Sequence, residues 1–397
     1  MLYGKGHFYF SNCPGPVAHT ESFAVYRRQH DNQLCLAAGY AHGVCEEEEY
    51  VLFPLHDLQR DDRRSIGTSI RAKVSVARGL TSELVAINPN VSVSGVKTGW
   101  QAKPTSRLAS CKVYIRLTES IENPQMWLDA MMHVNHFSVI RGDTEGPACL
   151  FAVEHDKHHG YRILDASHMS IATLPSIPSN QPNSVGTVVD MLEHIAIFKF
   201  IEGIENKTPS APFEASFEMA LLNSKWEDRT NDGVLTLTHG DCLSLTVRNL
   251  GPKPLYLAVL DLCPSWKVIN LVSLDGGGDY IVISPGEEEC IDWSMIVPEW
   301  LQKKGLSQCE DVIKIFVTER PTSFAPLSLP EIPMTADAPG RHVRGQHNLL
   351  NGLLSQLSHA IRHAAEENDN WTTRNFIVHT FCPSNQEYLY EPATLPE

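Results

Sequence analysis

The sequence predicts a mainly β protein with α+β elements, and two patterns carry this prediction. Short runs in which apolar and polar residues alternate, separated by Gly, Pro and Asp, recur along most of the chain and are typical of half-buried strands. A few longer segments instead repeat apolar residues at the spacing of a helix surface. A length of 397 residues allows two to four compact domains, and we expect four regions and one linker.

Residues 1–120 are predicted to form a small domain that resembles a β-barrel or sandwich. Strand patterns cover residues 22–58, 70–87 and 111–117, with turn residues between them. The last two alternate aliphatic and polar residues, which places one face of each strand in a core. The acidic run at 46–49 fits a solvated turn between strands.

Residues 121–210 are predicted to be an α+β segment that contains helices. Pro124 suits the first turn of a helix over residues 124–137. The polar turn "DKHHG" at 156–160 joins two strands in a predicted hairpin. A second amphipathic helix covers residues 184–206, and its apolar stripe comprises Val188, Met191, Leu192, Ile195 and Phe198.

Residues 211–326 are predicted to form an immunoglobulin-like β-sandwich, because β-rich segments and Gly, Pro or Asp turns alternate there at regular spacing. Within it, we expect residues 237–266 to fold as neighbouring antiparallel strands. A Pro-rich linker follows at 327–346. The last region, 347–397, is predicted to hold an amphipathic helix at 347–368, which docks on the sandwich or on a partner.

The composition limits the possible binding partners and the cellular compartment. A net charge of −15 argues against non-specific nucleic-acid binding, which needs Lys and Arg to displace phosphate counterions. We expect no membrane partner, because no apolar run is long enough for a spanning helix and the N-terminus lacks the pattern of a signal peptide. The ten cysteines form no CxxC pair, which favours reduced thiols in a cytoplasmic protein.

Two fragments, His239-Gly240-Asp241 and Asp261-Leu262-Cys263, are similar to those that mark a caspase-like cysteine protease. Such an enzyme needs a thiolate and a histidine base, each after a parallel strand, with a crossover helix between the strands. Cys263 comes only 24 positions after His239, and the interval contains Gly251 and two prolines. We therefore expect no catalytic residue here, and keep a dyad of His239 and Cys263 as the alternative.

Other motifs are better explained by structure than by chemistry. His155, His158 and His159 surround the polar turn of the predicted hairpin, where a solvated loop explains them better than a metal site does. The glycine-rich run at 274–280 has no Lys-Ser/Thr pair after it, so it fits a strand connection and not a phosphate-binding loop. We expect no metal and no cofactor.

Several segments resemble the region that follows the protease domain in fungal caspase-like (metacaspase-related) proteins. In the predicted sandwich these are "GDCLSLTVRN" (240–249), "PLY" (254–256), "DLCPSW" (261–266), "ISPGEE" (283–288) and "DVIKIFVTERPTSF" (311–324). Upstream, the resemblance extends to "YGKGHFYFSN" (3–12), "AAGYAHGV" (37–44) and "MLEHIAIFKFIEGIEN" (191–206).

The resemblance implies a non-catalytic accessory or regulatory region that binds protein partners or a caspase-like protease domain. The catalytic His and Cys of that family lie in a domain that would precede residue 1, so none is carried over to this chain. A truncated product, an incomplete gene model and a paralogue that kept only the accessory half are all compatible with it. The alternative is a cysteine endopeptidase, acting through His239 and Cys263 or only together with a protease domain; a ligand-binding, lectin-like sandwich is a third possibility.

Overall fold

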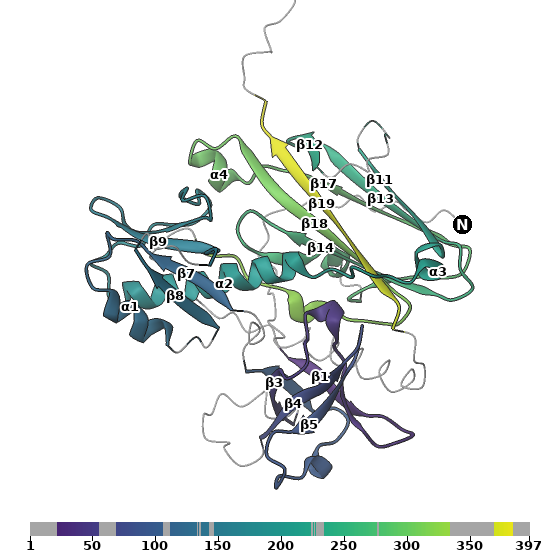
Figure 1. Ribbon diagram of the computed structural model, residues 1–397. Helices are drawn as coiled ribbons and strands as arrows, with labels where there is room; N and C mark the ends of the chain where they lie inside the picture. Colours follow the sequence, from purple (N-terminus) through teal and green to yellow (C-terminus); the bar gives the residue numbers. More distant parts are fainter. Residues whose placement is uncertain are drawn as a thin grey trace, which may run out of the picture.

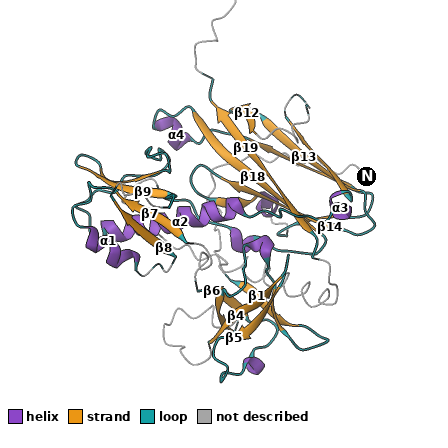
Figure 2. Ribbon diagram, in the orientation of Figure 1, coloured by secondary structure: helices purple, strands orange, loops and turns teal. Residues whose placement is uncertain are grey.

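The computed structural model describes residues 22–54, 69–105, 112–132, 134, 136–142, 147–223, 225, 227, 234–275, 278–333 and 369–383. They form three units: a barrel, a small sheet with two helices, and a sandwich of two sheets (Figure 1). Strands make up most of the regular structure of the described chain (Figure 2), so the predicted mainly β fold is confirmed. In the described part of the chain, no helix combines the length and apolarity needed to cross a membrane.

The first unit is a closed antiparallel barrel, which confirms the barrel predicted for the N-terminal region. Alternate side chains of its strands fill one core, as the period-two pattern requires. The strands close in the order β1-β2-β5-β4-β3-β6. Their bounds are β1 Phe23–Arg27, β2 Leu34–Leu36, β3 Glu49–Phe53, β4 Ile70–Ala77, β5 Ser82–Ala86 and β6 Gln101–Pro104, with the short 3₁₀ helices η1 Tyr40–His42 and η3 Val93–Gly95.

The second unit is a four-stranded sheet in the order β10-β9-β7-β8. Strand β7 runs parallel to both β8 and β9, while β9 and β10 form the predicted antiparallel hairpin. The strand predicted at 111–117 therefore belongs here and not to the barrel, because the apolar face of β7 packs on both helices. The bounds are β7 Val113–Leu117, α1 Pro124–Met131, β8 Phe137–Arg141, β9 Phe151–Asp156, β10 Gly160–Leu164 and α2 Ser184–Gly203.

Helix α1 ends at Met131, six residues before the predicted end at 137, where strand β8 begins. Helix α2 is buried along more than one face. Its side chains share a core with β7 and β9 and also with Ala258, Leu260 and Leu262 of strand β14. Helix α2 therefore lies between the small sheet and the sandwich and joins the two units (Figure 1).

The third unit is a sandwich of a three-stranded sheet, β11-β13-β17, and a larger sheet, β12-β19-β18-β14-β15, with β16 also paired to β14. Within the larger sheet, β12 pairs with its neighbour β19, and the two strands run parallel. This two-sheet arrangement is a β-sandwich, as predicted, with strands that are otherwise antiparallel. The bounds are β11 Phe217–Leu222, β12 Val234–Thr238, β13 Cys242–Asn249, β14 Leu255–Leu262, β15 Val268–Asn270, β16 Ile281–Ile283, β17 Glu288–Ser294, β18 Gln308–Thr318 and β19 Trp371–Phe381, with α3 Ala211–Glu214, α4 Glu299–Lys303, η4 Leu271–Asp275 and η5 Ala325–Leu327.

Three sequence predictions about the sandwich are wrong. Strands β13 and β14 are not neighbours in one hairpin but lie in opposite sheets, because β14 is buried on both faces and takes a central place in the larger sheet. The sandwich does not end at 326, since β19 completes it from the region predicted as a tail. The start of the predicted linker is packed, with Leu329 and Ile332 buried and Leu329 bridged to Val268. The predicted helix at 347–368 lies outside the described residues.

The barrel is fixed to the sandwich through a buried histidine. The ring of His42 stacks on Phe324 at 4.9 Å, and its Nε2 lies 3.1 Å from the carbonyl oxygen of Ser323. Burial lowers the pKa of His42 to about 4, so the ring is neutral at pH 7. On the same side, a Cβ added at Gly79 would lie 2.6 Å from the carbonyl oxygen of Asp369, so the barrel backbone approaches the start of β19 closely.

Candidate functional site

His239 lies in the turn directly after β12. Its backbone N–H donates to the carbonyl of Phe381 at 2.8 Å, and its Nδ1 accepts a hydrogen bond from the backbone N–H of Val297 at 3.0 Å. The next residue, Gly240, has a φ of 91°, which suits glycine and turns the chain into β13. The imidazole therefore ties this turn to the segment that follows β17.

Cys263 lies at another place, in the turn from β14 to β15. Its backbone N–H donates to Lys267 and its carbonyl accepts from Trp266, both at 2.9 Å. The indole of Trp266 packs on Phe198 of α2 at 5.0 Å. The turn that carries the thiol is thus held by its own hydrogen bonds and by the helix.

The structure does not bring His239 and Cys263 together. Strands β19 and β18 separate β12 from β14 in the larger sheet. Three strand spacings amount to about 14 Å, far beyond the reach of a hydrogen bond. Burial, and then the charges of Asp261 and Asp311, raise the pKa of the Cys263 thiol, which is the opposite of what activates a cysteine nucleophile.

The thiol instead belongs to an acid–thiol cluster, which we define as Asp261, Cys263 and Asp311. One carboxylate oxygen from each aspartate and the Cys263 sulfur all lie within 4.8 Å of one another. Strand register explains the convergence, because Leu262 at the end of β14 pairs with Val312, which places the next residue, Cys263, opposite Asp311. No other group of three such side chains in the described residues is close enough to hold a metal ion.

Both aspartates point into the end of the sandwich interior. They continue the inward-facing rows of β14 and β18, in which Val259 and Ile313 are buried in the sandwich core. Asp311 is only 6% exposed, and the thiol of Cys309 lies 3.7 Å from its Oδ2. Asp261 as a whole is half-buried, but its Oδ1 is inaccessible to solvent and has no hydrogen-bond partner among the described residues.

The environment opposes ionisation of both carboxyl groups. Burial raises the pKa of Asp261 to about 6, against the opposing effects of a hydrogen bond from the Cys263 thiol and of the Lys267 charge. The pKa of Asp311 is raised by burial and then by the negative charge of Asp261. Two carboxyl groups this close cannot both ionise without cost. The sequence does not reveal this pair, because Asp261 and Asp311 are distant in the chain and converge only through the register of β14 and β18.

The other histidines that the sequence singled out have structural partners. In the β9–β10 turn, the Oδ1 of Asp156 accepts from the backbone N–H groups of His158 and His159 at 2.8 and 3.0 Å. The ring of His155 packs against that of Tyr161, with 5.0 Å between the ring centroids. These contacts describe a polar hairpin turn, and the three imidazoles do not converge on one point there.

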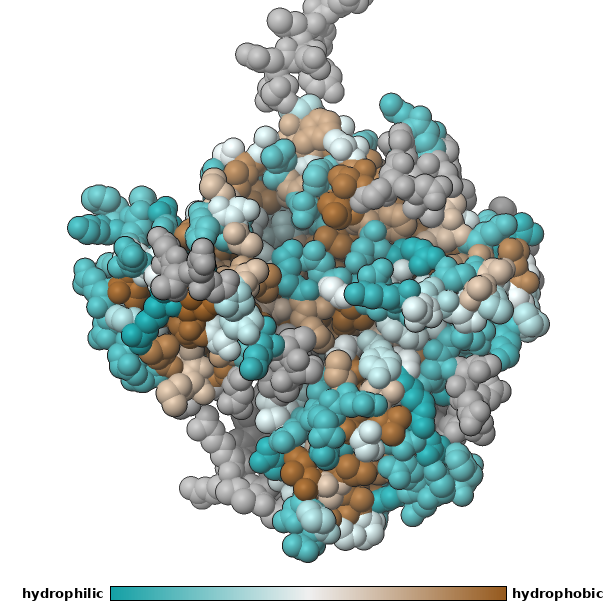
Figure 3. Space-filling model, viewed as in Figure 1, coloured by the Kyte–Doolittle hydropathy of each residue, from teal (hydrophilic) through white to brown (hydrophobic). Residues whose placement is uncertain are grey.

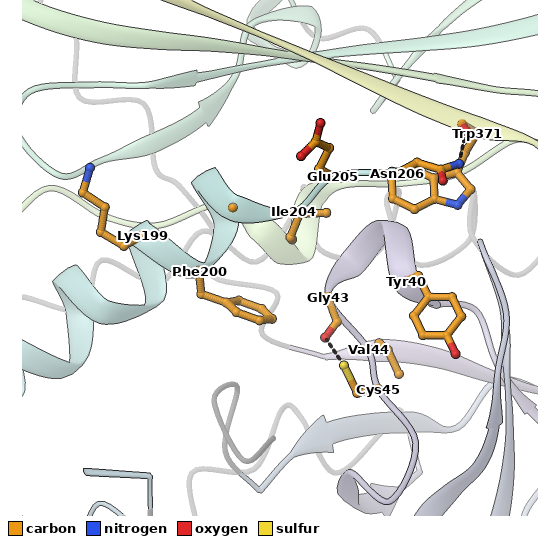
Figure 4. Close-up of a pocket in the computed structure, with 11 residues that line it drawn as sticks. Tyr40, Gly43, Val44, Cys45, Lys199, Phe200, Ile204, Glu205, Asn206 and Trp371 are labelled. Atoms are coloured by element: carbon orange, nitrogen blue, oxygen red, sulfur yellow. Dashed lines mark hydrogen bonds between the residues drawn. The ribbon is translucent and has the colours of Figure 1, made fainter. Parts of the chain in front are cut away.

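A separate hollow of about 420 Å³ lies where the three units meet (Figure 4). The turn after η1 and the end of α2 form its walls, with Trp371 of β19 beside them. The ring of Phe200 lies close to Gly43, where an added Cβ would come within 2.4 Å of it. The lining residues are Tyr40, Gly43, Val44, Cys45, Lys199, Phe200, Gly203, Ile204, Glu205, Asn206 and Trp371.

No protein-family model matches this sequence, and no curated protein is similar to it. Among solved structures, the alkylpurine DNA glycosylase AlkC of Pseudomonas fluorescens, bound to DNA containing an abasic site analog, matches with a TM-score of 0.16 and 13% identity. The match covers 30% of this chain and 29% of that one. A likeness at this level carries no argument about fold or function.

Proposed function

We propose that this chain is a non-catalytic accessory or regulatory region of a fungal caspase-like protein, which contacts protein partners or a caspase-like protease domain in the cytoplasm. The supporting observation is that the segments resembling that family pack against one another. The segment at 311–324 supplies Ser323 and Phe324, which contact His42 from the segment at 37–44. Helix α2, from the segment at 191–206, packs on β14, which begins in the segment at 254–256.

This packing supports a scaffold that acts as one unit. The core around α2 also contains residues of the sandwich and, at its edge, Ala41 and Leu80 of the barrel, so the three units can present a fixed surface to a partner. The space-filling view shows polar residues over much of that surface, with apolar residues also gathered near the α1–β8 side (Figure 3). Exposed apolar side chains there include Met126 and Met132 of the α1 region.

The site geometry favours this proposal over the cysteine endopeptidase. A peptidase of that kind requires an accessible thiolate beside an imidazole. Here the Cys263 thiol is surrounded by carboxyl groups that raise its pKa, and His239 hydrogen-bonds a backbone amide elsewhere. The eight cysteines within the described residues are all free thiols, which supports a reducing compartment.

Iodoacetamide labelling separates the two candidates. We expect Cys263 in the folded, chelator-treated protein to react more slowly at pH 7 than the exposed Cys290, with no change in rate after His239→Ala. Cys263→Ala and Cys290→Ala variants assign each labelled site by mass spectrometry. Fast labelling of Cys263 at pH 7 that is lost in His239→Ala would support the endopeptidase and contradict the accessory role.

The partner is tested by sequencing the transcript upstream of Met1. A caspase-like reading frame there, whose separately produced domain binds this chain in isothermal titration calorimetry, is the expected result. A complete transcript that starts at Met1, together with no binding to a fungal caspase-like protease domain, would contradict the proposal.

A further inference from the structure

We propose that the acid–thiol cluster is a binding site for one divalent metal ion of the zinc class. It combines one sulfur and two carboxylate donors, which come from the β14–β15 turn and from two strands of the larger sheet. Zinc binds cysteine at about 2.3 Å and carboxylate at about 2.0 Å, so one sulfur and two oxygen donors around a tetrahedral ion lie about 3.3–3.5 Å apart. A maximum separation of 4.8 Å between the donor atoms can close to this range by small side-chain rotations.

The hydrogen bonding of the two aspartates calls for a further ligand. Oδ1 of Asp261 is cut off from solvent without a partner among the described residues. Within the same residues, Asp311 is reached by the Cys309 thiol, which is a weak donor. Buried carboxylates are ordinarily paired, hydrogen-bonded or bound to metals. A dication between them would supply the missing partner and remove their mutual repulsion.

The donor set selects the class of ion. A thiolate disfavours Mg²⁺ and Ca²⁺, which take oxygen ligands almost exclusively. Zinc accepts mixed sulfur and oxygen ligands, and three protein donors leave its fourth position for water or for another donor. Cys309 lies beside Asp311 and can hydrogen-bond that ligand or approach the fourth position.

Binding must release protons, since thiolate and carboxylate are the ligating forms. The Cys263 S–H gives its proton to solvent, and so does any carboxyl group of the pair that is protonated. No oxidation is involved. The reaction is thus an exchange of protons for the dication, and its affinity should increase with pH.

The site is preformed and lies near the protein surface. Asp311 lies on β18, between β14 and β19, and Cys263 is fixed by the two turn hydrogen bonds. As whole residues, Asp261 and Cys263 are half-buried, so the cluster lies near the protein surface at the β14–β15 turn. The site uses none of the contacts that support the accessory role, so either proposal can fail alone.

Cobalt provides a spectroscopic test on the full chain after treatment with a chelator. Titration with Co²⁺ is expected to produce a thiolate-to-cobalt charge-transfer absorption that saturates at one ion per chain, and Zn²⁺ should displace it. Cys263→Ser should abolish this absorption, and Asp311→Asn should weaken binding at least tenfold. Cys290→Ser is the matched control, because Cys290 also has a carboxylate near it, with Oδ1 of Asp292 at 3.6 Å.

Circular dichroism confirms that each variant is folded. The proposal is overturned if the folded wild-type chain shows no charge-transfer absorption, or if Cys263→Ser binds cobalt as the wild type does. If the wild-type chain binds no metal and the Asp261→Asn or Asp311→Asn variant is more stable than the wild type, the proposal is also overturned. The cluster would then be a pair of carboxyl groups that share a proton.

Discussion

Replacing Asp261 by Asn should stabilise the metal-free protein at neutral pH. The asparagine keeps the shape of the side chain but removes a buried charge that faces Asp311. The Asp261 carboxyl has an ordinary pKa of 3.8, which the fold raises to about 6. Each pKa unit corresponds to about 1.4 kcal/mol, so ionisation of this group costs the folded state up to about 3 kcal/mol. Because the residue is only half-buried, we expect a gain of about 2 kcal/mol at pH 7.

The pH dependence identifies the cause. A carboxyl group with a raised pKa binds its proton more tightly in the folded state, so stability falls as pH increases between the two pKa values. The free energies of unfolding of Asp261→Asn and wild type should therefore be similar near pH 4. They should diverge up to about pH 6 and stay apart above it, in the window set by 3.8 and about 6.

Urea denaturation followed by tryptophan fluorescence, in buffers from pH 4 to 8 that contain a chelator, measures this difference. Glu310→Gln is the control, since that exposed carboxylate lies next to Asp311 on β18 and should change stability by less than about 0.5 kcal/mol. A less stable Asp261→Asn variant at pH 7, or a difference that does not vary with pH, would refute the reasoning.

Three further perturbations test the packing. Lys314→Met should cost about 3 kcal/mol in urea denaturation, because the buried Nζ donates to the carbonyls of Glu202 and Ile204 at the end of α2; a loss below about 1 kcal/mol would contradict this. The free energy of unfolding of wild type, measured relative to His42→Gln, should fall by up to about 3 kcal/mol as pH falls from 6.5 towards 4, since burial lowers the pKa of His42 to about 4. Phe316→Ala should cost about 3–5 kcal/mol in thermal unfolding, because its fully buried ring stacks on Phe324 at 4.0 Å; a loss near that of an exposed Phe381→Ala control would show the packing to be unimportant.

Local periodicity predicted the barrel, the β9–β10 hairpin and helix α2. Each of these has one dominant pattern that short-range geometry can satisfy. The assignment of strands to sheets could not be predicted in the same way. Strand β14 is apolar on both faces, and the reason is the position of α2 against its outer face, which is a contact distant in sequence. Strand β19 was missed because a Pro-rich stretch and a helical pattern separate it from the rest of the sandwich.

Part of the acid–thiol cluster was visible in the sequence. Asp261 follows Leu255, Leu257 and Val259 at the next inward position of the strand, and a carboxylate in such a row is unusual. The convergence with Asp311 was not visible, because it depends on the register between β14 and β18. Sequence spacing alone does not fix such a register.

Strand β19 has a consequence for the order in which this protein assembles. It pairs with β18 along eleven residues and with β12 along five, yet it follows every other described strand in the chain. During synthesis, the edges of β12 and β18 that pair with β19 therefore remain unpaired until β19 has left the ribosome. For the same reason, a peptide of residues 369–383 supplied separately should complement a chain that ends at 333, which offers a split reporter for assembly of the sandwich.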